Sequence, residues 1–257
     1  MTAEYQWRIE GEGYDLVLIH GWGMNAAVWH HLLPLLTPYF RVHLIDLPGY
    51  GYNSQYVSEH IDEVAQLLLN KLPASAIWLG WSLGGLVAKK ATLMAPERVK
   101  ALVTVASSPC FTAQPRWRGI KPSVLAEFET QLAEDYQALI ERFMALQAMG
   151  SKTARQDIKQ LKSAVLDYPS PDPVALKQGL DWLAKLDLRE ELGAIASPWL
   201  RMYGRLDGLV PIKVATELDS QVTNSTSVVF QAASHAPFIS HPEEFVAALR
   251  TFVTSLE

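Results

Sequence analysis

The sequence has a single cysteine and little excess charge. Cys110 is the only cysteine among 257 residues, so no disulfide can form within the chain. The net charge is −5, whereas a protein that binds nucleic acid over its whole surface carries an excess of basic residues. These two features argue against a disulfide-stabilised domain and against a general nucleic-acid-binding protein.

Long hydrophobic runs and metal-binding motifs are also missing. No uninterrupted apolar segment approaches the roughly 20 residues that a membrane-spanning helix needs, and residues 1–10 are polar. The sequence contains no His-Glu-x-x-His motif, no pair of cysteines and no phosphate-binding glycine loop. We therefore expect a monomeric cytoplasmic protein that uses no metal and no cofactor, and that binds neither membrane nor nucleic acid.

Short apolar runs alternate with helical patterns along most of the chain. The runs are rich in β-branched residues, and they predict strands at residues 16–20, 40–46, 76–80, 101–106, 199–203 and 227–231. Strands that alternate with helices are typical of an α/β fold with a mostly parallel sheet. The sequence therefore predicts a central sheet flanked by helices.

One long segment lacks convincing strands and has helical spacing instead. Helical spacing runs through residues 124–149, a second helix is predicted from Ser151 to about residue 166, and Asp172-Pro173 is a good start for a third. We predict an all-helical cap of residues 111–189, inserted into a core formed by residues 1–110 and 190–257.

The sequence Gly80-Trp81-Ser82-Leu83-Gly84 matches the pattern G-x-S-x-G. A predicted strand leads into it and an apolar helix follows, which is the strand–turn–helix setting of a nucleophile elbow. Such a turn is sharp, so small residues must flank the serine, and it exposes the hydroxyl above the sheet. Ser82 is therefore our candidate nucleophile. The alternative is a structural serine in a glycine-rich turn.

A serine nucleophile requires a base, and in this arrangement the acid and then the histidine follow it in the chain. Asp207 directly follows a predicted strand, and His235 lies just past the last one. Catalytic groups gather at the carboxyl ends of strands in open α/β sheets, so we predict a catalytic triad of Ser82, Asp207 and His235. Other histidines and aspartates are weaker candidates for the base and the acid, and they are His30, His31, His43, His60, His241, Asp187 and Asp219.

Hydrolysis of an ester also needs donors for the negative charge that develops on the carbonyl oxygen. The backbone N–H of Leu83, next to the nucleophile, is the first candidate. The second is the N–H of Trp22 in the loop His20-Gly21-Trp22-Gly23, where glycine allows a close approach of the backbone. The alternative interpretation is that this loop is a tight turn with no role in catalysis.

A group of basic residues lies on one face of a predicted cap helix. Lys152, Arg155, Lys159 and Lys162 are spaced by three, four and three residues, so they fall within about 80° of one another around the helix. The common interpretation of such a stripe is a solvated helix face. The functional interpretation is a docking site for an acidic partner.

With these residues in view, the chain resembles the pimeloyl-acyl carrier protein methyl ester esterases of biotin synthesis. These enzymes are carboxylesterases of the α/β-hydrolase fold. The resemblance extends nearly end to end, and it is densest in seven short segments. These are residues 20–23, 46–49, 77–85, 105–111, 143–147, 207–211 and 235–242.

The resemblance implies a substrate, a site and a partner. The substrate would be the methyl ester of a pimeloyl chain carried as a thioester on acyl carrier protein, hydrolysed by the triad named above through an acyl-enzyme. The implied substrate-binding residues are Trp22, Ser82, Leu83, Phe143, Met144, Ala145, Leu146, Gln147 and His235, and we add Phe111 as an apolar wall.

The resemblance also assigns carrier docking to Arg142, Arg155 and Lys159. Acyl carrier proteins are acidic, so a positive cap would attract them. Position 138 is alanine, where the family pattern leads us to expect another arginine.

Other functions compatible with this pattern remain open. A general short-chain carboxylesterase or a carbon–carbon-bond hydrolase acting on free small molecules would share the triad. A non-catalytic ligand receptor can be built on the same fold. Dehalogenases and epoxide hydrolases of this fold carry aspartate at the nucleophile position, so Ser82 argues against both.

Overall fold

The predicted strands pair into one sheet. The computed structural model, which describes residues 4–148 and 154–256, contains seven strands in the order β1-β3-β2-β4-β5-β6-β7. Every neighbouring pair is parallel except β1 and β3. The strands are β1 (Trp7–Glu10), β2 (Tyr14–Ile19), β3 (Phe40–Ile45), β4 (Ala76–Trp81), β5 (Val99–Val105), β6 (Trp199–Gly204) and β7 (Ser225–Phe230).

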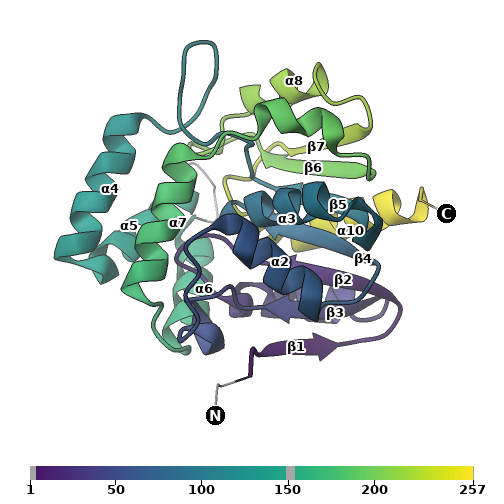
Figure 1. Ribbon diagram of the computed structural model, residues 1–257, viewed down its shortest axis with the longest axis horizontal. Coiled ribbons are helices and arrows are strands. Elements are labelled where there is room, and N and C mark those ends of the chain that lie inside the picture. The colour runs from purple at the N-terminus through teal and green to yellow at the C-terminus, as the bar shows by residue number, and fades with distance from the viewer. Residues whose placement is uncertain (1–3, 149–153, 257) are drawn as a thin grey trace.

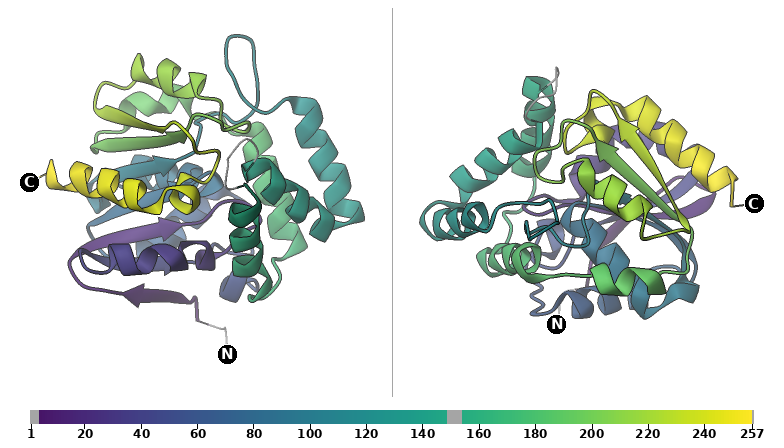
Figure 2. Two further views of the ribbon diagram at one scale, coloured as in Figure 1. Left: turned by 180° about the vertical axis from the view of Figure 1, so that it is seen from behind. Right: turned by 90° about the horizontal axis from the view of Figure 1, so that it is seen from above.

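Helices cover both faces of this sheet, as Figures 1 and 2 show. Helices α2 (Ile61–Lys71) and α3 (Leu83–Met94) lie side by side on one face, and α10 (Pro242–Thr254) lies on the other. The mostly parallel α/β architecture predicted from the sequence is therefore confirmed. The shorter helices outside the cap are η1 (Ala26–Leu32), α1 (Leu33–Leu36), η2 (Gly51–Asn53), η3 (Pro96–Arg98), η4 (Arg189–Ala194), α8 (Lys213–Asp219) and α9 (Pro237–Ser240).

The remaining helices are grouped beside the sheet (Figure 1) and lie between β5 and β6 in the chain. We call α4 to α7 the cap helices; the predicted domain boundaries after residues 110 and 189 remain a prediction. Asp172 caps α7 through its side chain, as expected. The cap helices are α4 (Pro122–Glu134), α5 (Tyr136–Ala148), α6 (Ala154–Leu166) and α7 (Pro173–Lys185).

Helical spacing across residues 124–149 covers two helices rather than one. Asp135 has an extended backbone, with φ −154° and ψ 92°, and ends α4. Its carboxylate accepts a hydrogen bond from the Ala138 N–H, at 3.0 Å, and so caps the start of α5. The hydrophobic spacing continues across this break, and therefore did not reveal it. Ser151, the predicted start of the next helix, lies outside the described residues.

Burial explains why the central strands were easy to predict and β1 was not. Every residue of β4 and β6 is buried, as expected for strands of a parallel sheet covered on both faces. The edge strand β1 is only partly buried, and its Ile9 is exposed. Its four residues alternate between apolar and polar, but the run is too short to stand out from the polar residues around it, so its pairing with β3 identifies it as a strand.

Candidate active site

Ser82 lies at the turn between β4 and α3. Its backbone has φ 54° and ψ −116°, a conformation that side-chain-bearing residues rarely adopt. A Cβ added to Gly80 would lie 2.2 Å from the Gly84 carbonyl oxygen, and one added to Gly84 would lie 2.5 Å from the His20 carbonyl oxygen. Both glycines are therefore required for the turn to close. The strain at Ser82 is what a nucleophile elbow predicts.

Asp207 and His235 come together at the same edge of the sheet. Nδ1 of His235 donates to Oδ2 of Asp207 at 2.7 Å, and both side chains are buried. The other carboxylate oxygen, Oδ1, accepts from the backbone N–H groups of Leu209 and Val210, at 2.8 and 3.0 Å. The carboxylate is thus held in one orientation, and it fixes the imidazole with Nε2 free to accept a proton.

The second imidazole nitrogen has no partner in the described part of the chain. Nε2 of His235 is buried and makes no hydrogen bond there, so Ser82 is not yet hydrogen-bonded to it. Ser82 is 3% exposed and His235 is 0% exposed. Such bonds are often long in proteins without substrate and shorten when the substrate binds.

The backbone of His235 is held from two sides. Its carbonyl oxygen accepts from Nε1 of Trp81, the residue before Ser82, at 2.9 Å. Its N–H donates to the Gln147 carbonyl oxygen, at the end of cap helix α5, also at 2.9 Å. The elbow and the cap therefore both position the histidine. The sequence analysis did not identify Trp81 in this role, since nothing local links it to residue 235.

The loop after β2 lies directly beside Ser82. A Cβ added to Gly21 would come within 3.3 Å of the Ser82 Cβ, so glycine relieves crowding at this close approach. The backbone N–H groups of Trp22 and Leu83 donate to no acceptor in residues 4–148 and 154–256. Both predicted oxyanion donors are thus unoccupied, and both belong to segments that meet at Ser82.

His20 positions this loop, a role that the sequence analysis missed. Its Nδ1 lies 2.8 Å from the Gly21 carbonyl oxygen, and its Nε2 accepts from the Leu47 N–H at 3.0 Å. Burial lowers the pKa of His20 below its usual value, so the ring is neutral and provides one donor and one acceptor. A histidine that directly follows a buried strand was the available signal.

Aromatic side chains form the wall between core and cap. The rings of Trp22 and Phe143 meet edge to face, with centroids 5.0 Å apart, and Nε1 of Trp22 donates to the Leu176 carbonyl oxygen in α7 at 2.8 Å. Gln147 is buried, and neither polar atom of its carboxamide has a partner among the described residues. An amide that is buried and unpaired in this position is available to a substrate.

The other predicted lining residues lie differently. In α5, Phe143 and Gln147 are one turn apart on one side, whereas Ala145 is exposed. Met144 is buried and lines a separate small cavity near Tyr136, and Leu146 is half-buried. Phe111 is buried, and its carbonyl oxygen accepts from the Ile120 N–H. Helix geometry thus brings only part of residues 143–147 to Trp22 and His235.

The predicted docking residues differ in how far their charges are neutralised. Arg142 forms an ion pair with Glu127 at 3.3 Å and a hydrogen bond to Gln131. The exposed Arg155 and Lys159 form no ion pair with a described residue. Ala138 is exposed.

The rest of the stripe contributes less than its spacing suggested. Lys162 pairs with Glu141 at 2.6 Å. Lys152 lies outside the described residues. Among the residues that the structure places, Arg155 and Lys159 are therefore the stripe cations without an acidic partner.

The described residues contain neither a metal-binding cluster nor a membrane-spanning helix. No group of three or more His, Cys, Asp or Glu side chains there is arranged to hold a metal ion. In the same part of the chain, no helix is long and apolar enough to cross a membrane.

Sequence comparison places the chain among hydrolases. A family model described as alpha/beta hydrolase fold matches residues 15–242. A pimeloyl-[acyl-carrier protein] methyl ester esterase of Photobacterium profundum is 63% identical over 253 residues, spanning 98% of this chain and 100% of that protein. A protein of the same name from Aliivibrio fischeri is 56% identical, spanning 98% of each.

Solved structures of lower identity share the fold. The esterase EaEST from Exiguobacterium antarcticum aligns with a TM-score of 0.85 at 21% identity, covering 96% of this chain and 94% of that one. A bromoperoxidase from Bacillus anthracis aligns with a TM-score of 0.86, also at 21% identity and with the same coverage. Because these proteins differ in named activity, they show the fold alone.

Proposed function

Since the chain belongs to the pimeloyl-[acyl-carrier protein] methyl ester esterases of the alpha/beta hydrolase family, we propose that Ser82, His235 and Asp207 hydrolyse the methyl ester of a carrier-bound pimeloyl chain. The observation that carries the assignment of residues is the buried Asp207–His235 pair. Nδ1 of His235 is bonded to Asp207, and its Nε2 has no partner among the described residues. The backbone of His235 is bonded to Trp81, the residue before Ser82.

The reaction proceeds through an acyl-enzyme. Oγ of Ser82 attacks the ester carbonyl carbon while Nε2 of His235 takes the hydroxyl proton, and the same proton then passes to the departing methoxide, which leaves as methanol. A water molecule repeats the sequence: His235 removes its proton, the hydroxide attacks the acyl carbon, and Ser82 regains the proton. Asp207 keeps the imidazole in the tautomer with Nδ1 protonated and stabilises the imidazolium.

The backbone donors stabilise the charge on the carbonyl oxygen. In each tetrahedral intermediate this oxygen accepts from the N–H groups of Trp22 and Leu83, which have no other acceptor in the described chain. Removing one such donor costs roughly 10²–10³ in kcat in enzymes of this kind. The hydrogen bonds of His20 and the close approach at Gly21 keep the Trp22 N–H near Ser82.

The apolar wall favours the ester over the product. Trp22, Phe143 and Phe111 provide an uncharged surface for the methylene chain. Hydrolysis converts the ester to a carboxylate, and a carboxylate is poorly solvated in such surroundings, so the product is released. The unpaired carboxamide of Gln147 offers a hydrogen bond to a polar group of the substrate.

Carrier docking belongs to the cap. Arg155 and Lys159 present positive charge that is not neutralised by a described carboxylate, and Arg142 adds charge that Glu127 partly offsets. An acidic carrier would be attracted to this surface. We further propose that the protein is a cytoplasmic monomer; its single cysteine is in keeping with a reducing compartment.

One comparison of substrates tests the proposal. We would measure kcat/KM for the methyl ester of pimeloyl-acyl carrier protein and for a short free methyl ester, with the wild-type enzyme and with Ser82→Ala. The proposal requires a large preference for the carrier substrate that is lost in the variant. Equal or faster hydrolysis of the free ester would leave the triad intact but would contradict the carrier assignment.

A further inference from the structure

Cap helix α7 is hydrogen-bonded to the two loops that follow β2 and β3. Nε1 of Trp22, in the first loop, donates to the Leu176 carbonyl oxygen at 2.8 Å. The hydroxyl of Tyr50, in the second loop, donates to the Ala175 carbonyl oxygen at 3.3 Å. Ala175 and Leu176 are neighbours in α7, so one turn of this cap helix holds a side chain from each loop.

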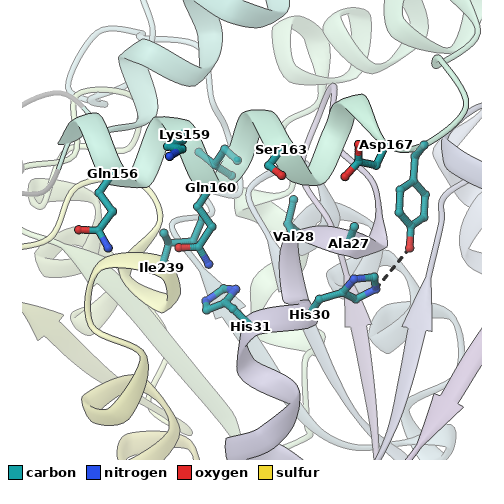
Figure 3. A pocket seen from close by; sticks show the side chains of 12 residues that line it. Ala27, Val28, His30, His31, Gln156, Lys159, Gln160, Ser163, Asp167 and Ile239 are labelled. Atoms are coloured by element: carbon teal, nitrogen blue, oxygen red, sulfur yellow. Dashed lines mark hydrogen bonds between the residues drawn. The ribbon is translucent and has the colours of Figure 1, made fainter.

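Helix α6 faces the core in a different way. A pocket of about 510 Å³ lies between α6 and η1, and it is lined by Gln160 of the helix and by Val28 and His31 of η1. Figure 3 shows Gln160 extending from α6 and His31 lying on the core side of this space. On the α7 side, by contrast, Trp22 and Leu176 are both fully buried. The cap is therefore packed tightly on the loop after β2 through α7.

The middle of α7 carries a glycine against the same two side chains. Gly179 is buried and lies in the interior of the helix. A Cβ at this position would lie 2.6 Å from Cδ1 of Trp22 and 2.9 Å from the hydroxyl oxygen of Tyr50. An interior glycine is unfavourable for a helix relative to alanine. Glycine is therefore required here by the close approach of the two side chains and not by the helix.

Neighbouring groups restrict the movement of both side chains. The Trp22 ring packs edge to face on Phe143, with centroids 5.0 Å apart. The Tyr50 ring packs edge to face on His20, with centroids 5.2 Å apart. The Tyr50 hydroxyl also accepts a hydrogen bond from the backbone of Gly23, and both rings are buried. A methyl group added between them would therefore displace these side chains together with the loop that contains Trp22.

The displaced loop carries one of the two proposed oxyanion donors. The donor is the backbone N–H of Trp22, and the loop passes so close to the nucleophile that a Cβ at Gly21 would lie 3.3 Å from the Cβ of Ser82. Such a donor is effective only when it lies about 2.7–3.1 Å from the oxygen on which the charge develops. Misplacing a catalytic group by about 1 Å can cost about a hundredfold in rate.

We propose that Gly179 is a positioning residue for ester hydrolysis: it leaves the space in which Trp22 and Tyr50 pack on α7, and so it keeps the Trp22 N–H where the oxyanion forms. Helix α7 then contributes to the chemical step as well as to the wall of the site. The proposal rests on the proposed function, because the oxyanion role of Trp22 belongs to it. Since Gly179 acts through a donor used in the transition state, its replacement should affect kcat more than KM.

The test compares Gly179→Ala with Gly193→Ala. Beyond its chain neighbours, a Cβ added to Gly193 would meet no atom within 4 Å, so the control adds the same methyl group without a clash. For the methyl ester of pimeloyl-acyl carrier protein, Gly179→Ala should lower kcat roughly 10- to 100-fold and change KM much less, because a displaced donor costs less than a removed one. The control should keep the wild-type kcat. Thermal unfolding curves would show that both variants are folded.

A transition-state analogue measures the oxyanion site directly. Oγ of Ser82 adds to the boron of butylboronic acid while the hydroxyl proton passes to His235, and an oxygen of the resulting tetrahedral anion occupies the oxyanion position. In Gly179→Ala the inhibition constant of this acid should rise about as much as kcat/KM falls. In Gly193→Ala it should match the wild type.

A second variant decides the matter if Gly179→Ala does not fold. Tyr50→Phe adds no atom and removes only the hydroxyl that joins Gly23 to Ala175, so it should lower kcat and weaken boronic acid binding by roughly three- to tenfold, as for the loss of one hydrogen bond. Wild-type kcat and wild-type boronic acid inhibition in either folded variant would overturn the proposal. Retained turnover in Ser82→Ala would instead contradict the proposed function, and that measurement does not involve α7.

Discussion

The Asp207–His235 pair and the charged pairs on the cap both join an acidic to a basic side chain, but they differ in burial and in how the backbone holds them. Asp207 and His235 are buried, 2.7 Å apart, and the carboxylate is also bonded to two backbone N–H groups. Arg142 and Glu127 are 3.3 Å apart, with side chains 47% and 58% exposed. A buried pair held by the backbone has one geometry, whereas an exposed pair exchanges with water and contributes little stability.

The comparison indicates how the two regions should respond to mutation. In the proposed mechanism the sheet edge holds the reacting atoms in fixed positions, so changes there should act on kcat. The proposed docking surface on the cap requires only positive charge at roughly the right place, so changes there should act on KM and on its dependence on salt.

The largest effect is expected from Ser82→Ala. Loss of the nucleophile should lower kcat by roughly 10⁴–10⁶ while the protein stays folded, because only the hydroxyl is removed. Steady-state kinetics with the carrier substrate and a thermal unfolding curve would measure both. A variant that keeps more than about a tenth of the normal rate would remove Ser82 from the mechanism.

Asp207→Asn should follow, with kcat lower by roughly 10³–10⁴. The backbone donors of Leu209 and Val210 would hold the amide oxygen, so the NH₂ group would face Nδ1 of His235 and stabilise the wrong tautomer. Asp187→Asn is the matched control, because Asp187 is exposed and pairs with Arg189. Similar losses in both variants would mean that the Asp207–His235 bond is not specific to catalysis.

A third prediction concerns stability in the core. Lys89 of α3 is fully buried, and its Nζ donates to Oγ of Ser107 at 2.9 Å and to the Ser108 carbonyl oxygen at 3.3 Å. Burial, with a smaller effect of Arg201, lowers its pKa from 10.5 to about 7. The unfolded chain therefore holds this proton over a range in which the folded protein has released it. Stability should rise from about pH 7 to about pH 10, by up to about 1.4 kcal/mol per pH unit.

Lys89→Met should abolish this rise and increase the free energy of unfolding near pH 7 by roughly 1–3 kcal/mol. Urea unfolding at several pH values would measure it. Lys90→Met is the control, since Lys90 pairs with Asp62 and Glu191 and should leave the pH dependence in place. An unchanged pH dependence in Lys89→Met would contradict a neutral buried amine.

The smallest effects are expected on the cap. Arg155→Glu with Lys159→Glu should raise KM for the carrier substrate about tenfold and weaken its salt dependence. Arg142→Glu should do less, because Glu127 already offsets its charge. Lys71→Glu, at the end of α2 away from the cap, is the control. If Arg142→Glu had the larger effect, the ion pair with Glu127 would have to open when the carrier docks.

Much of the fold was predictable because the strands of a parallel sheet carry a strong local signal. Residues of β4 and β6 are apolar at nearly every position, since helices cover both faces. The pairing of Asp207 with His235, next to the turn that carries Ser82, was predictable for a related reason. Each follows a strand, and the carboxyl ends of parallel strands lie at one edge of the sheet.

Other features depend on contacts between distant parts of the chain. The edge strand β1 has only four residues, and its pairing with β3 identifies it as a strand. The spacing of the basic stripe showed which basic residues share a helix face, but not that Glu141 lies where it pairs with Lys162. Asp135 interrupts a hydrophobic spacing that continues on both sides of it. For β1 and for Lys162, the partner that decides the outcome (β3 and Glu141, respectively) lies in another segment of the chain.

The elbow around Ser82 follows from the amino-acid order alone, because a strand, a turn with small flanking residues and an apolar helix are all local properties. How His235 is held depends instead on the packing of distant segments. Its carbonyl oxygen bonds to Trp81, 154 residues earlier, and its N–H bonds to Gln147 of the cap. Hydrogen bonds over such separations exist only after distant segments of the chain have packed together, since no local preference specifies their partners.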